Sequence, residues 1–165
     1  MGQSKKIKPQ SDKQCMQWNC VVWRIGGFMN FENSLNDGKA KKVMPASIRA
    51  SSLFKSSIQA IETAKAIQLN PNTLKSVLRE LYEGLREYCE AIGYLRGYKF
   101  LDHESVGYFL RDILKEQSVS MKFDRYRRLR NGINYYGEDI NIETVKEAII
   151  EIPELVKKLE KYSKS

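Results

Sequence analysis

Residues 70–95 read NPNTLKSVLRELYEGLREYCEAIGYL and contain the clearest structural signal in the chain. Asn70 can cap a helix, and Pro71 suits the first helical position, where its missing N–H is not needed. Apolar side chains then recur at spacings of three and four residues: Leu74, Val77, Leu78, Leu81, Leu85, Tyr88, Cys89, Ile92 and Leu95. This spacing predicts a long amphipathic helix with one buried face.

The segments on either side have the same helical period. Four further helices are expected at residues 47–67, 102–114, 123–137 and 141–159. Asp102 and Asn141 are expected to be N-caps, Gly137 is expected to end a helix, and Pro153 should kink the last one. No alternating strand pattern is found. Short loops between long helices favour antiparallel neighbours, so the predicted fold class is an all-α, antiparallel up-down bundle of four to five helices.

The composition predicts one domain with an unevenly charged chain. The 165 residues include 42% hydrophobic side chains, enough for a substantial core. The net charge is +8, and residues 1–45 contain eight basic and three acidic side chains, against twenty and seventeen in residues 46–165. We therefore expect a basic and apolar N-terminal extension at residues 1–36 and the bundle at residues 37–165. The extension is either a disordered arm or a segment preceding a true start at Met29.

Several classes of protein are excluded by absent signals. The sequence has no run of about 20 apolar residues and no secretory leader, so we expect a cytoplasmic protein without a membrane segment. Cys15, Cys20 and Cys89 lack the second ligand pair that a zinc site needs. We find no glycine-rich phosphate loop and no carboxylate cluster, and we expect neither a metal nor a cofactor.

The helix expected at residues 123–137 has two distinct stripes. One is expected to be buried and contains Tyr126, Leu129, Ile133 and Tyr136. The other is polar and contains Arg127, Arg130, Asn131, Asn134 and Tyr135. Arginine can bind phosphate through paired hydrogen bonds, asparagine can bind a base edge or a sugar hydroxyl, and tyrosine can stack on a base. This stripe favours binding of RNA or a nucleotide. The alternative is a solvated helix face whose cations pair with acids such as Glu143 and Glu147.

Two quoted segments carry a resemblance to a known family. Residues 123–137, FDRYRRLRNGINYYG, and residues 81–99, LYEGLREYCEAIGYLRGYK, resemble the HEPN domain (higher eukaryotes and prokaryotes nucleotide-binding). The similarity covers roughly residues 37–160. The family implies a bundle of four or five helices that usually dimerises. Many members are metal-independent ribonucleases with a motif of arginine, a polar residue, three variable residues and histidine. Arg130 and Asn131 match the first two positions, and Tyr135 occupies the histidine position.

That departure determines the expected function. In active members, the resemblance implies, arginine and histidine from two protomers assist attack of a ribose 2′-hydroxyl on the adjacent phosphate. A phenol has a pKa of about 10, against about 6.5 for imidazole, so Tyr135 is a poorer acid or base at neutral pH. The only histidine, His103, is expected to be a helix-start residue.

Three functions are therefore left open. The first is a degenerate, dimeric HEPN module that binds RNA or a nucleotide, or that is the partner of a minimal nucleotidyltransferase in a toxin–antitoxin-like system. The second is a metal-independent endoribonuclease in which Arg130 acts with Tyr135 or His103. The third is a purely structural homodimer.

Overall fold

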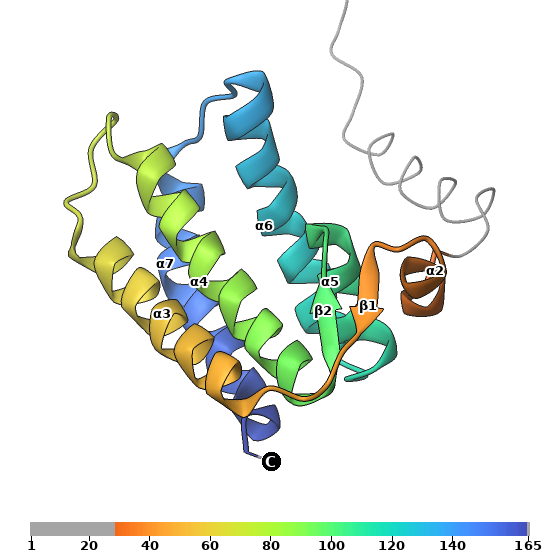
Figure 1. Ribbon diagram of the computed structural model, residues 1–165. Coiled ribbons are helices and arrows are strands. Elements are labelled where there is room, and N and C mark those ends of the chain that lie inside the picture. Colours follow the sequence, from red (N-terminus) through yellow and green to blue (C-terminus); the bar gives the residue numbers. More distant parts are fainter. Residues whose placement is uncertain (1–28, 165) are drawn as a thin grey trace, which may run out of the picture.

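The computed structural model describes residues 29–164, and within this range the chain forms a helical bundle with one small sheet (Figure 1). The elements are α2 (Phe31–Asn36), β1 (Ala40–Lys42), α3 (Ser47–Ala66), α4 (Leu74–Leu95), β2 (Tyr98–Phe100), α5 (His103–Asp112), α6 (Gln117–Tyr136), α7 (Ile142–Leu159) and η1 (Glu160–Tyr162). The all-α prediction is confirmed. The predicted N-terminal arm, up to residue 28, lies outside the described residues. No helix within them is long and apolar enough to cross a membrane.

Helix α4 is the centre of the bundle. It contacts α3, α5, α6, α7 and β2, and Figure 1 shows it between α3 and α6 with α7 behind it. More than half of its residues are buried, among them Leu78, Leu81, Leu85 and Ile92. The apolar spacing that predicted this helix therefore buries it against several neighbours at once.

Helices α3 and α4 approach each other closely at a glycine. Ser57 donates a hydrogen bond from Oγ to the carbonyl oxygen of Gly84 at 2.6 Å, across the interface between the two helices. A Cβ atom on Gly84 would lie 2.6 Å from Cγ1 of Ile61 and 2.9 Å from the carbonyl oxygen of Ser57. Both distances are shorter than van der Waals contact, so this packing requires glycine at position 84.

Three predicted helix boundaries are confirmed by their geometry. The side chain of Asp102 accepts a hydrogen bond from the N–H of Ser105, and that of Asn141 accepts one from the N–H of Thr144. Each therefore satisfies a backbone donor in the first turn of its helix. Gly137 ends α6 with a left-handed φ of +67°, which glycine adopts without a steric penalty. The proline inside α7 does not end that helix.

Helix α6 begins earlier than predicted, at Gln117 rather than near Phe123. Lys115 has a φ of +61° and turns the chain between α5 and α6. Val119 is then buried, and Ser120 donates a hydrogen bond from Oγ to the carbonyl oxygen of Gly107 at 2.8 Å. Contacts with α5 thus stabilise a first turn whose sequence has neither a side-chain cap nor a clear apolar period.

The predicted buried stripe of α6 is correct except at its C-terminal end. Tyr126 and Ile133 are buried and Leu129 is half-buried, but Tyr136 is 79% exposed. Figure 1 shows this end of α6 extending past the N-terminal end of α4. Among the described residues no helix covers this last turn, so the apolar period of α6 continues after its burial has ended.

The two short strands were not predicted from the sequence. β1 and β2 pair antiparallel, with Ala40 opposite Phe100, Lys41 opposite Lys99 and Lys42 opposite Tyr98. Three residues a strand are too few to show an alternating pattern. The apolar side of this ribbon is held by an aromatic cluster, in which the ring centroid of Phe31 lies 5.1 Å from that of Tyr98.

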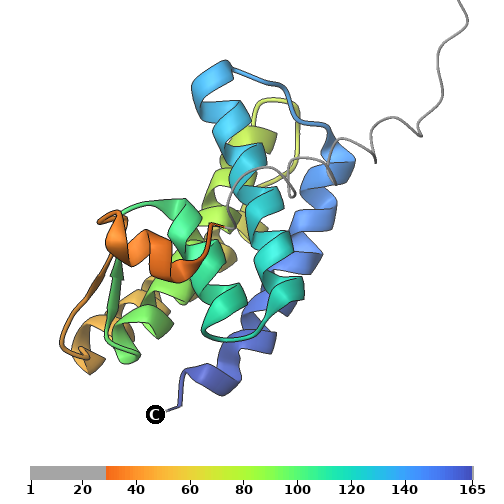
Figure 2. The same ribbon diagram turned by 90° about the vertical axis from the view of Figure 1, so that its right-hand side faces the viewer.

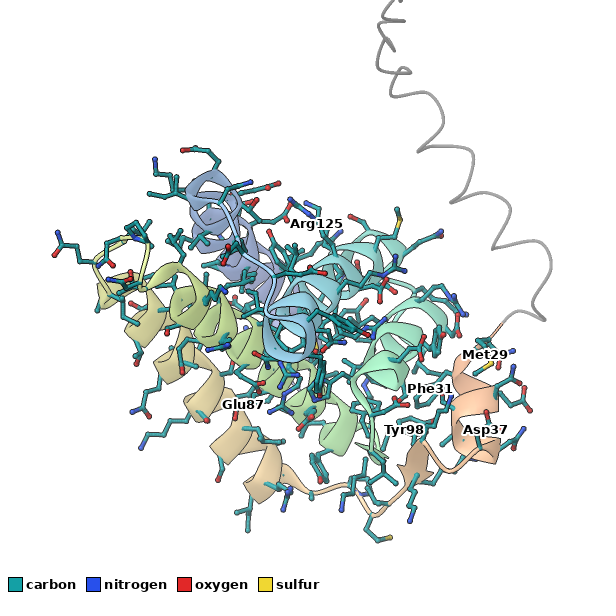
Figure 3. The ribbon with its side chains drawn as sticks, turned by 90° about the horizontal axis from the view of Figure 1, so that it is seen from above. Met29, Phe31, Asp37, Glu87, Tyr98 and Arg125 are labelled. Atoms are coloured by element: carbon teal, nitrogen blue, oxygen red, sulfur yellow. The ribbon has the colours of Figure 1, made fainter. Side chains whose placement is uncertain are left out.

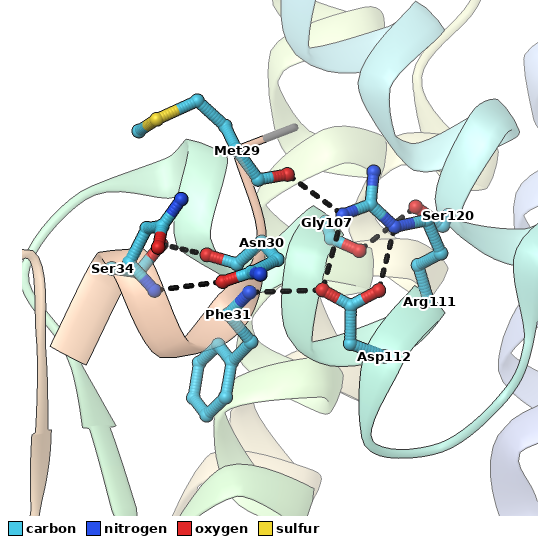
Figure 4. A network of polar contacts seen from close by, with 9 residues as sticks. Met29, Asn30, Phe31, Ser34, Gly107, Arg111, Asp112 and Ser120 are labelled. Carbon is cyan, nitrogen blue, oxygen red and sulfur yellow. Dashed lines mark hydrogen bonds and ion pairs between the residues drawn. The ribbon is translucent and has the colours of Figure 1, made fainter. Parts of the chain in front are cut away.

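Helix α2 belongs to the packed domain, although its residues fall in the range assigned to the N-terminal extension. Figure 2 shows α2 beside α5 and the strands, and Phe31 is buried. Figure 4 shows how α5 attaches it: Arg111 donates to the carbonyl oxygen of Met29 at 2.8 Å, and Asp112 accepts from the N–H of Phe31 at 2.9 Å. The packed part of the chain therefore includes residues before position 37.

We predict opposite effects for alanine at two helical glycines. Gly84→Ala should lower the free energy of unfolding by about 1–2 kcal/mol, because overpacking costs more than the gain in helix propensity. Gly107→Ala should be neutral or should raise it by up to about 1 kcal/mol, because a Cβ there would meet its nearest atoms at 3.9 Å. Urea unfolding of both variants measures the difference. Equal free energies for the two variants would contradict the close approach of α3 and α4.

Candidate functional site

Polar side chains of α4 and α6 face each other in a regular register. Arg79 donates from Nε to Oδ1 of Asn134 at 2.7 Å. One turn along both helices, Nη2 of Arg130 lies 3.8 Å from Oε1 of Glu83. The antiparallel packing of the two helices therefore creates a polar seam beside the core.

The structure brings most of the predicted polar stripe to this seam. Arg130 donates to Oδ1 of Asn131 at 3.4 Å, and its Cζ lies 5.9 Å from the ring centroid of Tyr135. Tyr135 is 71% exposed, and Asn134 is also exposed. Arg127 lies deeper, with a side chain 18% exposed. An exposed ring, two amides and a guanidinium thus lie close together near the C-terminal end of α6.

Most other cations of α6 are neutralised within the protein. Arg127 donates twice to Oδ1 of Asp124, at 2.9 and 2.6 Å. Arg125 binds both carboxylate oxygens of Glu147, at 2.8 and 2.6 Å, and Figure 3 shows Arg125 on the outer side of the helices. The predicted pairing with Glu147 is confirmed, whereas Glu143 pairs with Lys146 within α7. These cations therefore belong to a solvated helix face whose charges are paired with acids of the same chain.

Arg79 and Arg130 are the exceptions along the seam. Within residues 29–164, Arg130 has one carboxylate oxygen within 4.0 Å, at the long distance of 3.8 Å, and Arg79 forms no ion pair. The single bond to Asn134 holds Arg79 through Nε, which leaves its terminal nitrogens for another acceptor. These two guanidiniums can therefore bind an anion without first breaking a strong ion pair.

His103 is the first residue of α5, as expected, and it lies against the same network. Its Nδ1 is 2.9 Å from the hydroxyl of Tyr82. Burial lowers the pKa of His103 below its usual value of 6.5, and the positive charges of Arg86 and Arg130 lower it further, while Glu83 opposes them. The imidazole is therefore neutral at pH 7.

Sequence reasoning missed the contribution of α4 to this site. Arg79, Tyr82, Glu83 and Arg86 all face the seam or its histidine, and Arg86 binds Glu83 at 2.7 Å and also pairs with Glu90. A signal was present, because positions 79, 83, 86 and 90 are charged residues that helical spacing places along one side of the amphipathic helix. In the described range, no group of three or more His, Cys, Asp or Glu side chains could hold a metal ion.

No protein-family model, no curated protein and no solved structure matches the chain. The resemblance in motif described above therefore remains a prediction.

We predict that His103 titrates below pH 6.5. The chain contains one histidine, so protein purified without a histidine tag should give one imidazole signal in a proton NMR titration. Since the folded pKa is lowered, the unfolded chain takes up the proton first as the pH falls through about 6.5, and stability should decrease there. Above that pH His103 is neutral in both the folded and the unfolded chain, and it should cause no change of the unfolding free energy with pH.

The matched control for this titration is His103→Gln, whose unfolding free energy should lack this pH-dependent loss. An imidazole pKa at or above 6.5 in the wild-type protein would show that the ring is not buried among cations.

Proposed function

We propose that the chain is a HEPN-type module that binds RNA or a nucleotide as a homodimer. The binding surface is the seam between α4 and α6, called here the α4–α6 face and defined by Arg79, Arg130, Asn131, Asn134 and Tyr135. The observation that carries the proposal is the state of Arg130, which has a distant carboxylate partner and an exposed aromatic ring beside it.

The groups on the α4–α6 face suit the parts of a nucleotide. Arg79 and Arg130 offer guanidinium donors to phosphate oxygens. The exposed ring of Tyr135 offers a surface on which a base can stack. The amides of Asn131 and Asn134 can bind a sugar hydroxyl or a base edge. A phosphate, a sugar and a base therefore each have a complementary group within one small surface.

The resemblance also supports the proposed partners. Dimerisation is the usual state in the family that residues 81–99 and 123–137 resemble. A minimal nucleotidyltransferase in a toxin–antitoxin-like system is the protein partner that we propose. The tyrosine at position 135 favours binding over catalysis, because a phenol transfers protons poorly near pH 7.

We expect Arg130→Gln to weaken binding of a labelled single-stranded RNA by about tenfold or more, since a charged hydrogen bond contributes about 1.5–3 kcal/mol. The slope of log affinity against log salt concentration should also decrease by about 0.7, the value for one phosphate contact. Fluorescence anisotropy at several salt concentrations measures both quantities.

The matched control is Arg125→Gln, which removes the same charge from the same helix but from the ion pair with Glu147. This variant should bind like the wild-type protein. Equal losses for both variants would indicate a general charge effect, and wild-type protein that binds no RNA at low salt would refute the proposal.

A second function, a metal-independent endoribonuclease, is favoured by the position of His103. The neutral imidazole lies in the same charge network as Arg86, Arg127 and Arg130. Arg130 would stabilise the charged phosphate while His103 would transfer the proton. Tyr135 is less suited to that role, because a phenol transfers protons poorly near pH 7 and the residue is 71% exposed.

This second function predicts cleavage of RNA in the presence of a chelator, with 2′,3′-cyclic phosphate ends. His103→Gln and Arg130→Ala should each lower the rate by about a hundredfold or more, as expected for lost acid–base or phosphate stabilisation. End-group analysis of the products measures this. Cleavage that survives both substitutions would come from a contaminant, and absence of cleavage would leave binding as the function.

A further inference from the structure

The exposed side of the two-stranded sheet carries lysines without acidic partners. Lys41 and Lys99 are exposed on this side. The next residue of β1, Lys42, is exposed as well, although strand alternation turns it to the other side, and the three lysines together are called here the basic ribbon. Within residues 29–164, no carboxylate lies within 4.0 Å of any of these three ammonium groups, whereas the described ion pairs elsewhere occupy most arginines and several lysines.

The register places two of these lysines in direct opposition. Lys41 is the cross-strand partner of Lys99, so both side chains project from the same side of the ribbon. Like charges at directly opposed positions destabilise a strand pair. The fold therefore tolerates a local repulsion here.

Protection of strand edges does not account for this arrangement. A lysine on an edge strand does discourage pairing with another chain. One lysine on each strand would serve that purpose at staggered positions, or opposite an acidic residue, without the repulsion. Direct opposition concentrates positive charge on one side of the ribbon.

The ribbon lies at the opposite end of α4 from Arg79. A Cβ on Gly93 of α4 would meet the ring of Phe100 in β2, so β2 packs against α4 there. Gly93 follows Arg79 by fourteen positions, which corresponds to about 21 Å along the helix. A single strand with about 3.4 Å between stacked nucleotides covers that length with about six nucleotides. Beyond β2 the chain returns to the middle of α4, where His103 forms a hydrogen bond with Tyr82.

We propose that the basic ribbon binds the phosphate backbone of an RNA strand that also contacts the α4–α6 face. This inference rests on the proposed function and narrows it, because the ligand is then an RNA of more than about six nucleotides and not a mononucleotide. Lysine suits this role, since its ammonium group binds phosphate as a point charge without reading sequence.

The first test compares two double variants with equal charge. Lys41→Gln with Lys99→Gln should weaken binding of a labelled 12-nucleotide RNA by about tenfold at low salt and reduce the salt slope by about 1.4, for two phosphate contacts. Affinity for AMP should not change. The control is Lys55→Gln with Lys157→Gln, which removes two exposed lysines on α3 and α7 and should leave both ligands unaffected.

The second test separates binding from folding. Lys99→Glu should replace the opposed like charges with an opposite-charge pair and raise Tm by about 1–3 °C. The same variant should bind the 12-nucleotide RNA at least as weakly as the double glutamine variant. A loss of affinity with a raised Tm cannot come from unfolding.

The outcomes distinguish the two proposals. If the ribbon variants bind the 12-nucleotide RNA with the wild-type slope while Arg130→Gln does not, the ribbon inference is wrong and the α4–α6 face stands. If the ribbon variants lose binding while Arg130→Gln binds like the wild-type protein, RNA binds the ribbon without the α4–α6 face, which refutes both the proposed function and a strand that contacts both surfaces. Exposed Met44 and Leu101 flank the ribbon, so vesicles containing phosphatidylserine are included. Lysine-dependent vesicle binding without an effect on RNA would overturn the inference in favour of a membrane surface.

Discussion

The burial of α4 is the constraint on which the rest of the described structure depends. Its apolar residues cover a wide arc, and α3, α5, α7 and β2 all pack against it and exclude water from it. The remaining arc carries Arg79, Glu83 and Arg86, and α6 lies along this arc with its own polar stripe. The site is therefore assembled by core packing, and its side chains do not depend on a mobile loop for their position.

The arginines of this seam differ in how closely they contact carboxylates, and this difference decides which of them can bind a ligand. Arg86 and Arg127 have side chains 17% and 18% exposed and contact carboxylates closely, so a ligand would have to displace those acids. The side chain of Arg130 is similarly buried, with 19% of its surface exposed, but its Nη2 lies 3.8 Å from Oε1 of Glu83, a longer contact. Similar burial with weaker pairing leaves more unsatisfied hydrogen-bonding capacity, which concentrates the binding potential near Tyr135 and Asn134.

The helices could be predicted from sequence because their apolar period and their caps agree. Asp102 and Asn141 are short-range signals that act within three residues, so no knowledge of the fold is needed to interpret them. The first turn of α6 and both strands depend instead on partners far along the chain, and so does the exposure of Tyr136. For the candidate site, Arg130, Asn131 and Asn134 were identifiable from one helix. The part played by Arg79 follows from its alignment with a residue 55 positions away.

The attachment of α2 to α5 has a consequence for sequence variation. Arg111 and Asp112 bind a carbonyl oxygen and an N–H of the main chain at positions 29 and 31. Almost any amino acid at position 29 would offer the same carbonyl oxygen. The side chain at position 29 can therefore change without loss of the hydrogen bond from Arg111 to the main chain. In related chains we therefore expect the basic and acidic pair at the end of α5 to be preserved more faithfully than the residue whose main chain it binds.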